Sequence, residues 1–209
     1  MKYDALVQKV TRLPCFNEVF LGERISQTLR NQLSRWAQQG KLIRLKRGIY
    51  ALPQEKQKIG CSEIFISNVL YSPSYVSLEF ALNFYGLIPE RATVVTAVST
   101  HKTKKFQNRM GTFSYRKVKE NLFFGYEKVR DEYGHSILMA TPEKALLDKL
   151  YFDSGFHFDS SYFIENLRLQ NFESLDIKKL KLYGEKMKVR KIQKMLPVFI
   201  NLIKEERKS

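Results

Sequence analysis

Polar and cationic donors crowd one side of a short segment near the N-terminus, SQTLRNQLSRWAQ, residues 26 to 38. Asn and Gln side chains can bond the edge of adenine in bidentate fashion, and Arg can do the same with guanine. An α-helix fits the major groove of B-DNA, so a helix that reads bases needs one donor-rich side and one packed side. We therefore predict base contacts from three residues, which are Gln27, Asn31 and Arg35.

The other side of this segment is apolar. At about 100° of rotation per residue, four apolar side chains fall on one side of a helix: Leu29, Leu33, Trp36 and Ala37. This spacing predicts an amphipathic helix. Ser26 is a favoured N-cap residue, and Gly40 can end the helix. The alternative interpretation is an ordinary amphipathic helix whose polar side is simply solvated.

Cations follow directly after the predicted helix. The stretch KLIRLKRGIYAL alternates as two short strands around Arg47 and Gly48, where a turn is expected because Gly accepts positive φ. Such a hairpin, or wing, can lie along the DNA backbone, with Arg47 at its tip near a minor groove. We expect backbone contacts from the helix start and the wing, through Ser26, Thr28, Arg30, Lys41, Arg44, Lys46 and Arg47.

Two further helices are expected before this segment. YDALVQKV carries one apolar stripe at helical spacing, and CFNEVFLGER predicts a short helix capped by Asn17 and ended by a turn at Gly22. Three helices and a basic hairpin predict a winged helix-turn-helix DNA-binding domain over residues 1–55. The polar run QEKQKIG is the predicted linker.

Residues 62–209 predict a second, mixed α/β domain, which makes the whole chain α+β. Its expected helices cover SEIFISNVLY, SLEFALNFYG and TPEKALLDKLYF, and its expected strands cover ATVVTAVST, GTFSYRKV and SILMA. Thr141, Pro142 and Glu143 supply an N-cap, an N1 proline and an acidic first turn in order. A helical tail is expected from about residue 160, where a proline, Pro197, is expected to kink the last helix.

Charge narrows the choice of partner. The 209 residues include 36 Lys and Arg against 21 Asp and Glu, a formal net charge of +15, which favours nucleic acid. No apolar run approaches the roughly 20 residues of a membrane span, and the N-terminus lacks the apolar core of a signal peptide, so we expect a cytoplasmic protein without membrane contact. The two cysteines, Cys15 and Cys61, suit reduced structural positions.

Two other sets of residues could carry chemistry. HKTKK, expected to form a loop, gathers a basic patch that suits phosphates, an acidic partner or plain solvation, through His101, Lys102, Lys104 and Lys105. A metal-dependent nuclease would draw on Glu79, Glu143, Lys144 and Asp148. Glu143 and Asp148 point about 140° apart on one helix, and the three histidines, His101, His135 and His157, are scattered, so we predict no metal, no cofactor and no catalytic residue.

Several stretches taken in order resemble the AbiEi-type antitoxins of type IV toxin-antitoxin and abortive-infection systems. They are GKLIRLKRGIYALP, SPSYVSLEFALNFYGLIPE, VVTAVSTHKTKKF, GTFSYRKV and ATPEKALLDKLYF, which together span about residues 3 to 152. The resemblance implies an N-terminal winged helix that represses its own operon by binding inverted repeats in promoter DNA. It also implies a C-terminal domain that counteracts a nucleotidyltransferase-like toxin without a stable complex.

We accordingly expect a DNA-binding autorepressor and antitoxin of phage defence, not an enzyme. Two alternatives stay open. One is a nucleic-acid-processing enzyme with a nuclease-like second domain, and the other is a protein-binding module targeted to DNA by the first domain.

Overall fold

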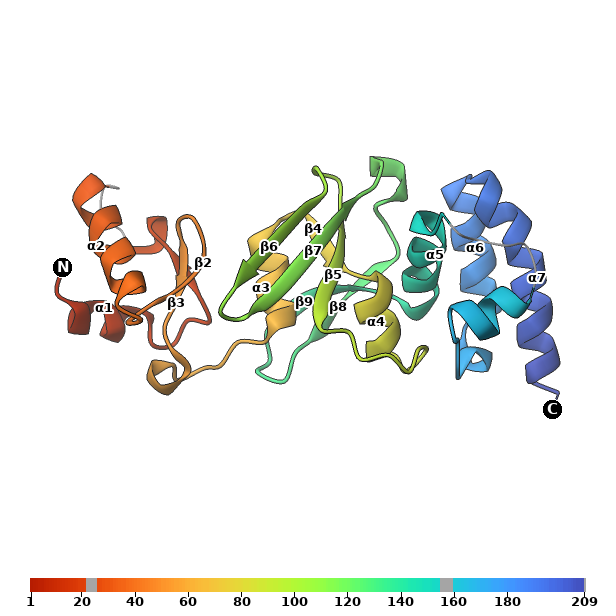
Figure 1. Cartoon of the computed structure of the whole chain (residues 1–209), viewed down its shortest axis with the longest axis horizontal. Coiled ribbons are helices and arrows are strands. Elements are labelled where there is room, and N and C mark those ends of the chain that lie inside the picture. Colours follow the sequence, from red (N-terminus) through yellow and green to blue (C-terminus); the bar gives the residue numbers. More distant parts are fainter. Residues whose placement is uncertain (22–25, 155–159, 209) are drawn as a thin grey trace.

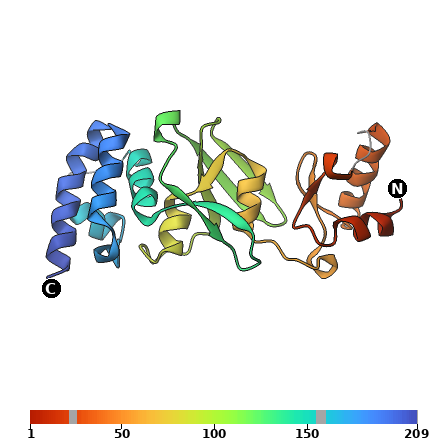
Figure 2. The same ribbon diagram turned by 180° about the vertical axis from the view of Figure 1, so that it is seen from behind.

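The computed structural model describes residues 1–21, 26–154 and 160–208 and has a mixed α+β fold. Figures 1 and 2 show three parts in a row: a small N-terminal unit, a central sheet, and a group of helices at the C-terminal end. The two termini therefore lie at opposite ends of the molecule.

The N-terminal unit contains the expected amphipathic helix and hairpin. Its elements in chain order are α1 (Tyr3–Val10), β1 (Phe16–Asn17), the 3₁₀ turn η1 (Val19–Leu21), α2 (Gln27–Gln38), β2 (Ile43–Lys46) and β3 (Ile49–Ala51). The strands form an antiparallel sheet in the order β1-β3-β2. Against the sheet and α1, α2 buries Leu29, Leu33 and Trp36, as the sequence spacing predicts.

The ends of α2 and the hairpin turn follow the local rules. Ser26 caps the helix through its Oγ, which accepts a 3.1 Å hydrogen bond from the Leu29 backbone N–H. Gly40, just past the helix, and Gly48, in the hairpin turn, have φ values of 74° and 81°, in the left-handed region that glycine tolerates best. All three predictions are confirmed.

The predicted second helix is not an α-helix, although a short helical turn capped by Asn17 does form there. In its place, Phe16 and Asn17 form the two-residue strand β1 beside β3, and Val19–Leu21 make a single 3₁₀ turn. Asn17 does cap that turn, because its Oδ1 accepts a 2.9 Å hydrogen bond from the Phe20 backbone N–H. The pairing of Phe16 with Tyr50 explains the difference, since it holds this segment extended until just before the turn. The turn predicted at Gly22 lies outside the described residues.

The central sheet has the strand order β6-β7-β5-β4-β9-β8. The strands are β4 (Ser74–Val76), β5 (Val94–Ser99), β6 (Lys104–Asn108), β7 (Gly111–Lys117), β8 (Tyr126–Arg130) and β9 (Ser136–Ala140). β5 pairs with β7, and β4 with β9, in parallel, while the other neighbours are antiparallel. Strands β5, β7 and β9 were expected. The short strands β4, β6 and β8 were not, because each is recognisable mainly by its partner.

Helices complete the central and C-terminal parts. They are α3 (Glu63–Leu70), α4 (Leu78–Phe84), α5 (Pro142–Phe152), α6 (Ile177–Met187) and α7 (Arg190–Glu206). Short helical turns lie at η2 (Gln54–Lys56), η3 (Glu120–Leu122), the π-helical η4 (Tyr162–Asn166) and η5 (Phe172–Ser174). The start of α5 is as predicted: the Thr141 Oγ1 accepts from the Lys144 N–H, and Pro142 is the first helical residue. Pro197 lies inside α7.

Two clusters of buried apolar side chains divide the interior. The smaller cluster draws on residues from Leu6 to Leu52, and the larger one fills the central and C-terminal parts. Leu45 and Ala51 are exceptions, since these residues of β2 and β3 belong to the larger cluster. The hairpin of the N-terminal unit is therefore packed directly against the central part.

Candidate nucleic-acid interface

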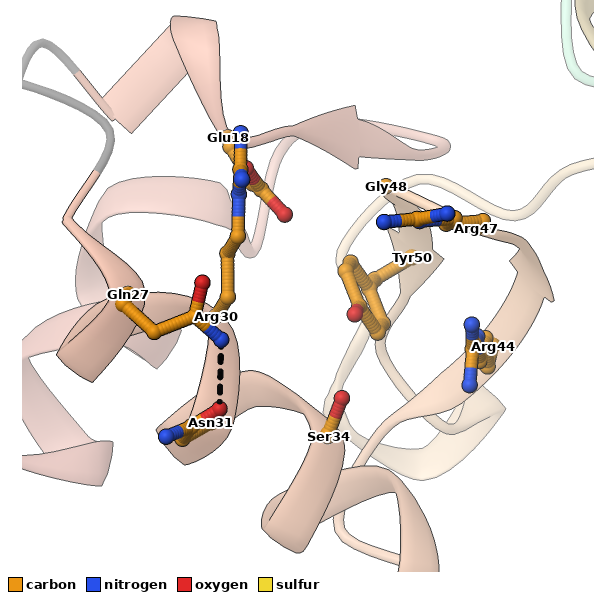
Figure 3. A pocket seen from close by; sticks show the side chains of 9 residues that line it. All are labelled: Glu18, Gln27, Arg30, Asn31, Ser34, Arg44, Arg47, Gly48 and Tyr50. Atoms are coloured by element: carbon orange, nitrogen blue, oxygen red, sulfur yellow. Dashed lines mark hydrogen bonds and ion pairs between the residues drawn. The ribbon is translucent and has the colours of Figure 1, made fainter.

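A groove of about 430 Å³ separates α2 from the β2–β3 hairpin. Figure 3 shows donors entering it from α2 on one side and from the hairpin on the other. We call it the helix–hairpin groove; its lining residues are Glu18, Gln27, Arg30, Asn31, Ser34, Arg44, Arg47, Gly48 and Tyr50. Six of these residues have side chains that can donate hydrogen bonds and come from α2 or from β2 and its turn. They are Gln27, Arg30, Asn31 and Ser34 of α2, Arg44 of β2 and Arg47 of the turn.

The α2 wall follows from helical geometry. Gln27, Asn31 and Ser34 are spaced by four and then three residues, so they lie on one face. The Gln27 Nε2 donates a 3.0 Å hydrogen bond to the Asn31 Oδ1, which orients both amides (Figure 3). Among the described residues no further partner engages the Nδ2 of Asn31 or the Oε1 of Gln27, so this donor and acceptor can contact a base edge together.

Arg30 brings a cation to the same wall but is paired within the protein. Its Nε lies 2.9 Å from the Oε2 of Glu18, whose side chain is 12% exposed, compared with 47% for Arg30. An ion pair between partly exposed groups contributes only about 0 to 1 kcal/mol to stability. Arg30 can therefore exchange this carboxylate for a phosphate at small cost.

Arg44 and Arg47 supply the charge of the opposite wall. Both are exposed, and in the described part of the chain neither forms an ion pair with a carboxylate. The floor beside them is Tyr50, which is buried and packs against the ring of Phe16 with 6.1 Å between centroids. Guanidinium groups are suited to phosphate oxygens, which they bind in a fork geometry.

Lys46, predicted to contact DNA from the wing, does not line the groove. A bulge interrupts the β2–β3 register, because Arg44 pairs with Tyr50 whereas Lys46, not Leu45, pairs with Ile49. The extra residue sends Lys46 away from the groove, where its Nζ donates a 2.7 Å hydrogen bond to the Leu70 carbonyl. Burial, and then the nearby charge of Lys104, lower the pKa of Lys46.

The other predicted DNA contacts lie around the groove without lining it. Arg35 and Thr28 are exposed on α2, and Ser26 is at its N-cap. Lys41 is exposed after the helix, with its Nζ 5.5 Å from the ring centroid of Tyr3. The structure thus brings together Gln27, Asn31, Arg30, Arg44 and Arg47 and leaves Arg35 and Lys41 at the periphery.

The basic patch of HKTKK is only partly a loop. Lys104 and Lys105 begin strand β6, where they pair with Tyr115 and Ser114 of β7, so the prediction of a loop is wrong for these two residues. His101 and Lys102 precede the strand and are exposed. The error has a physical cause: apart from Phe106, β6 is an edge strand of charged and polar residues, and its partner β7 gives it a regular structure.

The residues considered for a nuclease serve different purposes. Lys144 and Asp148 are both fully buried and paired, and Asp148 also accepts hydrogen bonds from the hydroxyls of Tyr75 and Ser77 at 2.9 and 2.8 Å. Glu143 accepts from the Asp176 backbone N–H, and Glu79 pairs with Lys149. Mutual attraction and hydrogen bonds hold this pair in the core, where they offset the cost of burying two charges.

Glu18, Ser34, Gly48 and Tyr50 are groove residues beyond the predicted set. Ser34 could have been found, because it is seven residues after Gln27 and shares its helix face. Tyr50 and Glu18 could not, because a cross-sheet pairing and a remote turn bring them to the groove.

Neither a protein-family model nor a curated protein matches this sequence. Over residues 1–21, 26–154 and 160–208, no three His, Cys, Asp or Glu side chains gather so that they could hold a metal ion. No helix in the same described ranges has the length and apolar character that a membrane crossing requires.

Proposed function

We propose that this protein is a DNA-binding transcriptional autorepressor whose N-terminal unit acts as a winged helix-turn-helix. In this proposal α2 is the reading helix, and the β2–β3 hairpin, Ile43–Ala51, is the wing. One observation carries it: the helix–hairpin groove, where amide donors of α2 face two arginines of the hairpin. Amides read base edges and guanidinium groups bind phosphates, so the two walls suit two parts of one duplex.

Three observations support a DNA duplex, and not a small molecule, as the ligand of the groove. It is open and polar, its cations lie on exposed side chains, and the whole chain carries a formal charge of +15. A site for a small molecule is usually concave and mostly apolar. The reading side of α2 is also solvent-exposed, since Gln27, Thr28, Arg30, Asn31 and Arg35 are all exposed, so a duplex can approach it.

The second part of the proposal rests on the resemblance to AbiEi-type antitoxins. We infer that the protein binds inverted repeats in its own promoter and counteracts a nucleotidyltransferase-like toxin in the cytoplasm through the residues beyond the linker. It does so without a stable complex with that toxin and without catalysis of its own.

Titration of two fluorescein-labelled duplexes at fixed salt tests the DNA-binding part. One duplex covers the DNA upstream of the chain's own coding sequence, and the other is its shuffled counterpart. The expected preference for the first is at least about 100-fold. Arg44→Ala combined with Arg47→Ala should weaken both alike and reduce the slope of log K against log salt by about 2. Arg190→Ala, which removes an exposed cation at the start of α7, is the matched control. Binding without preference, or unaffected by the double variant, would refute this proposal.

Co-expression tests the antitoxin part. The toxin would be the nucleotidyltransferase encoded beside this chain, and the readout is growth after its induction. The expected result is rescue by the parent chain and equally by the Arg44→Ala, Arg47→Ala variant, because repression and antitoxicity then reside in different parts. Failure of the parent to restore growth would reject antitoxicity, and co-purification of the two proteins would reject the mode without a complex.

A further inference from the structure

We propose that the tip of the β6–β7 hairpin, residues 108–111, is a positioning element that holds the wing in place for DNA. Asn108 is its principal residue. The inference rests on the proposed DNA-binding function and adds a role for residues that lie outside the helix–hairpin groove. In this proposal the central part of the molecule contributes to DNA binding because it positions the wing.

The central contact joins Asn108 to the middle of the wing strand. The Asn108 Nδ2 donates a 3.0 Å hydrogen bond to the carbonyl of Leu45 in β2. The same side chain is fixed from its own side, since its Oδ1 accepts a 2.7 Å hydrogen bond from the Met110 backbone N–H. Both ends of the amide are therefore engaged, and the half-buried side chain links a tight turn to β2.

Two further contacts, made by Leu45 and Lys46 of β2 itself, attach this strand to the central part. The Leu45 side chain is 3% exposed and belongs to the larger apolar cluster, across the boundary between the two parts. Lys46 reaches the carbonyl of Leu70 at the end of α3. An apolar contact and two hydrogen bonds thus fix β2 through consecutive residues.

The bulge in β2 makes this attachment compatible with DNA binding. In a regular strand Arg44 and Lys46 would share a face, and Leu45 would point the other way. The bulge instead leaves Arg44, with Arg47 beyond it, in the groove, while Leu45 and Lys46 contact the central part. One short strand can therefore be anchored on one side and present arginines on the other.

The same tip also comes close to the C-terminal end of α2. The Nη1 of Arg109 lies 3.6 Å from the place where a Cβ on Gly40 would be, immediately after the C-terminus of α2. A cation there suits the partial negative charge at the end of a helix. Asn108 thus contacts the wing strand while Arg109 lies beside the residue that follows the reading helix, so one tip is close to both elements.

The wing needs support of this kind. Its two strands have only four and three residues, and β1 pairs with β3 alone, which leaves β2 without a second strand partner in the small sheet. β2 is an edge strand of the small sheet and β6 an edge strand of the large one, and the tip of the β6 hairpin covers part of the β2 edge. Loss of the Asn108 contact would let the arginines spread over more orientations and weaken their contacts with phosphate.

The test compares Asn108→Ala in two backgrounds by titration of a fluorescein-labelled duplex of mixed sequence at low salt. In the parent chain we expect binding about three- to tenfold weaker, the effect of losing about one hydrogen bond. In the Arg44→Ala, Arg47→Ala background we expect no further loss, because the tip acts through those arginines. Gln107→Ala, an exposed neighbour in the same strand, is the matched control and should bind like the parent. Emission of Trp36, the single tryptophan, should be unchanged in every variant, which shows that the N-terminal unit is still folded.

Each other outcome has a definite meaning. Parent-like binding by Asn108→Ala, while the arginine variant binds weakly, would overturn the positioning role and leave the proposed function standing. An equal loss in both backgrounds would also overturn it, because Asn108 would then contact DNA itself. Parent-like binding by the arginine variant would refute the proposed function and this inference with it.

Discussion

The Nε of Arg30 lies 2.9 Å from the Oε2 of Glu18, so the one cation that α2 contributes to the groove is paired with a carboxylate in the free protein. A duplex must compete with Glu18 for this arginine and must also approach a negative charge. The pair joins α2 to the residue preceding η1, 12 positions earlier.

Glu18→Gln should therefore bind DNA more tightly than the parent. Removing the carboxylate frees Arg30 for a phosphate and removes a repulsion, and we expect about a three- to tenfold gain with a salt slope steeper by about 1. Anisotropy titrations across a salt series measure both quantities. Glu55→Gln, an exposed carboxylate in η2, is the control. Weaker binding by Glu18→Gln would instead mean that Glu18 accepts a hydrogen bond from a base or holds Arg30 in position.

Substitutions of Asn31 and of Arg35 should differ in their effect on the preference for one DNA sequence over another. Asn31 lines the groove with its amide oriented by Gln27, whereas Arg35 is exposed beside it. We expect Asn31→Ala to reduce the preference for the upstream duplex by about 1 to 3 kcal/mol, or roughly 5- to 150-fold. Arg35→Ala should weaken upstream and shuffled duplexes alike. The reverse pattern would place the Arg35 side of α2, and not the groove, against the bases.

Breaking the buried pair of Lys144 and Asp148 should be costly. Burial lowers the pKa of Lys144 and raises that of Asp148, so each depends on the other to stay charged in the core. Lys144→Met should lower the free energy of unfolding by about 3 to 5 kcal/mol. Lys149→Met on the same helix breaks a partly exposed pair with Glu79 and should cost less than about 1 kcal/mol. Urea unfolding measures both, and equal small losses would show that the buried pair is dispensable.

Asp131 should contribute stability that acid removes. Burial tends to raise its pKa, but hydrogen bonds from the Ser62 hydroxyl and from the backbone of His135 and Tyr133 outweigh burial and hold the pKa below its ordinary value of 3.8. A lowered folded-state pKa means that the contribution is present above pH 3.8 and is lost as the pH falls below it. Asp131→Asn should be less stable than the parent at pH 7, and the difference should shrink below pH 3.8. A difference that does not change with pH would contradict this assignment; thermal melts at several pH values measure it.

Local signals in the sequence predicted the elements that depend on near neighbours. Ser26 caps α2 through a residue three positions on, and Thr141 and Pro142 begin α5 in the same way. Gly48 makes the hairpin turn by its own backbone freedom. The buried faces of α2 and β7 likewise follow from periodicity alone, as Leu33 and Phe113 show.

Elements that depend on remote partners were missed or misplaced. The stretch around Val19 has a helical pattern, yet pairing of Phe16 with Tyr50 leaves only one turn of 3₁₀ helix. Lys104 and Lys105 look like a solvated loop, yet they are edge-strand residues because β7 lies beside them.

The residues of the candidate interface show the same contrast between local signals and remote partners. Residue type and helical spacing alone determined that Gln27 and Asn31 lie on one exposed face of α2 and that Arg44 and Arg47 follow in a hairpin. Only the tertiary structure decided that Glu18 neutralises Arg30, and that a bulge turns Lys46 toward Leu70. The physical reason is range: caps, turns and periodicity act within about four residues, whereas ion pairs, bulges and strand partners depend on segments that only folding brings together.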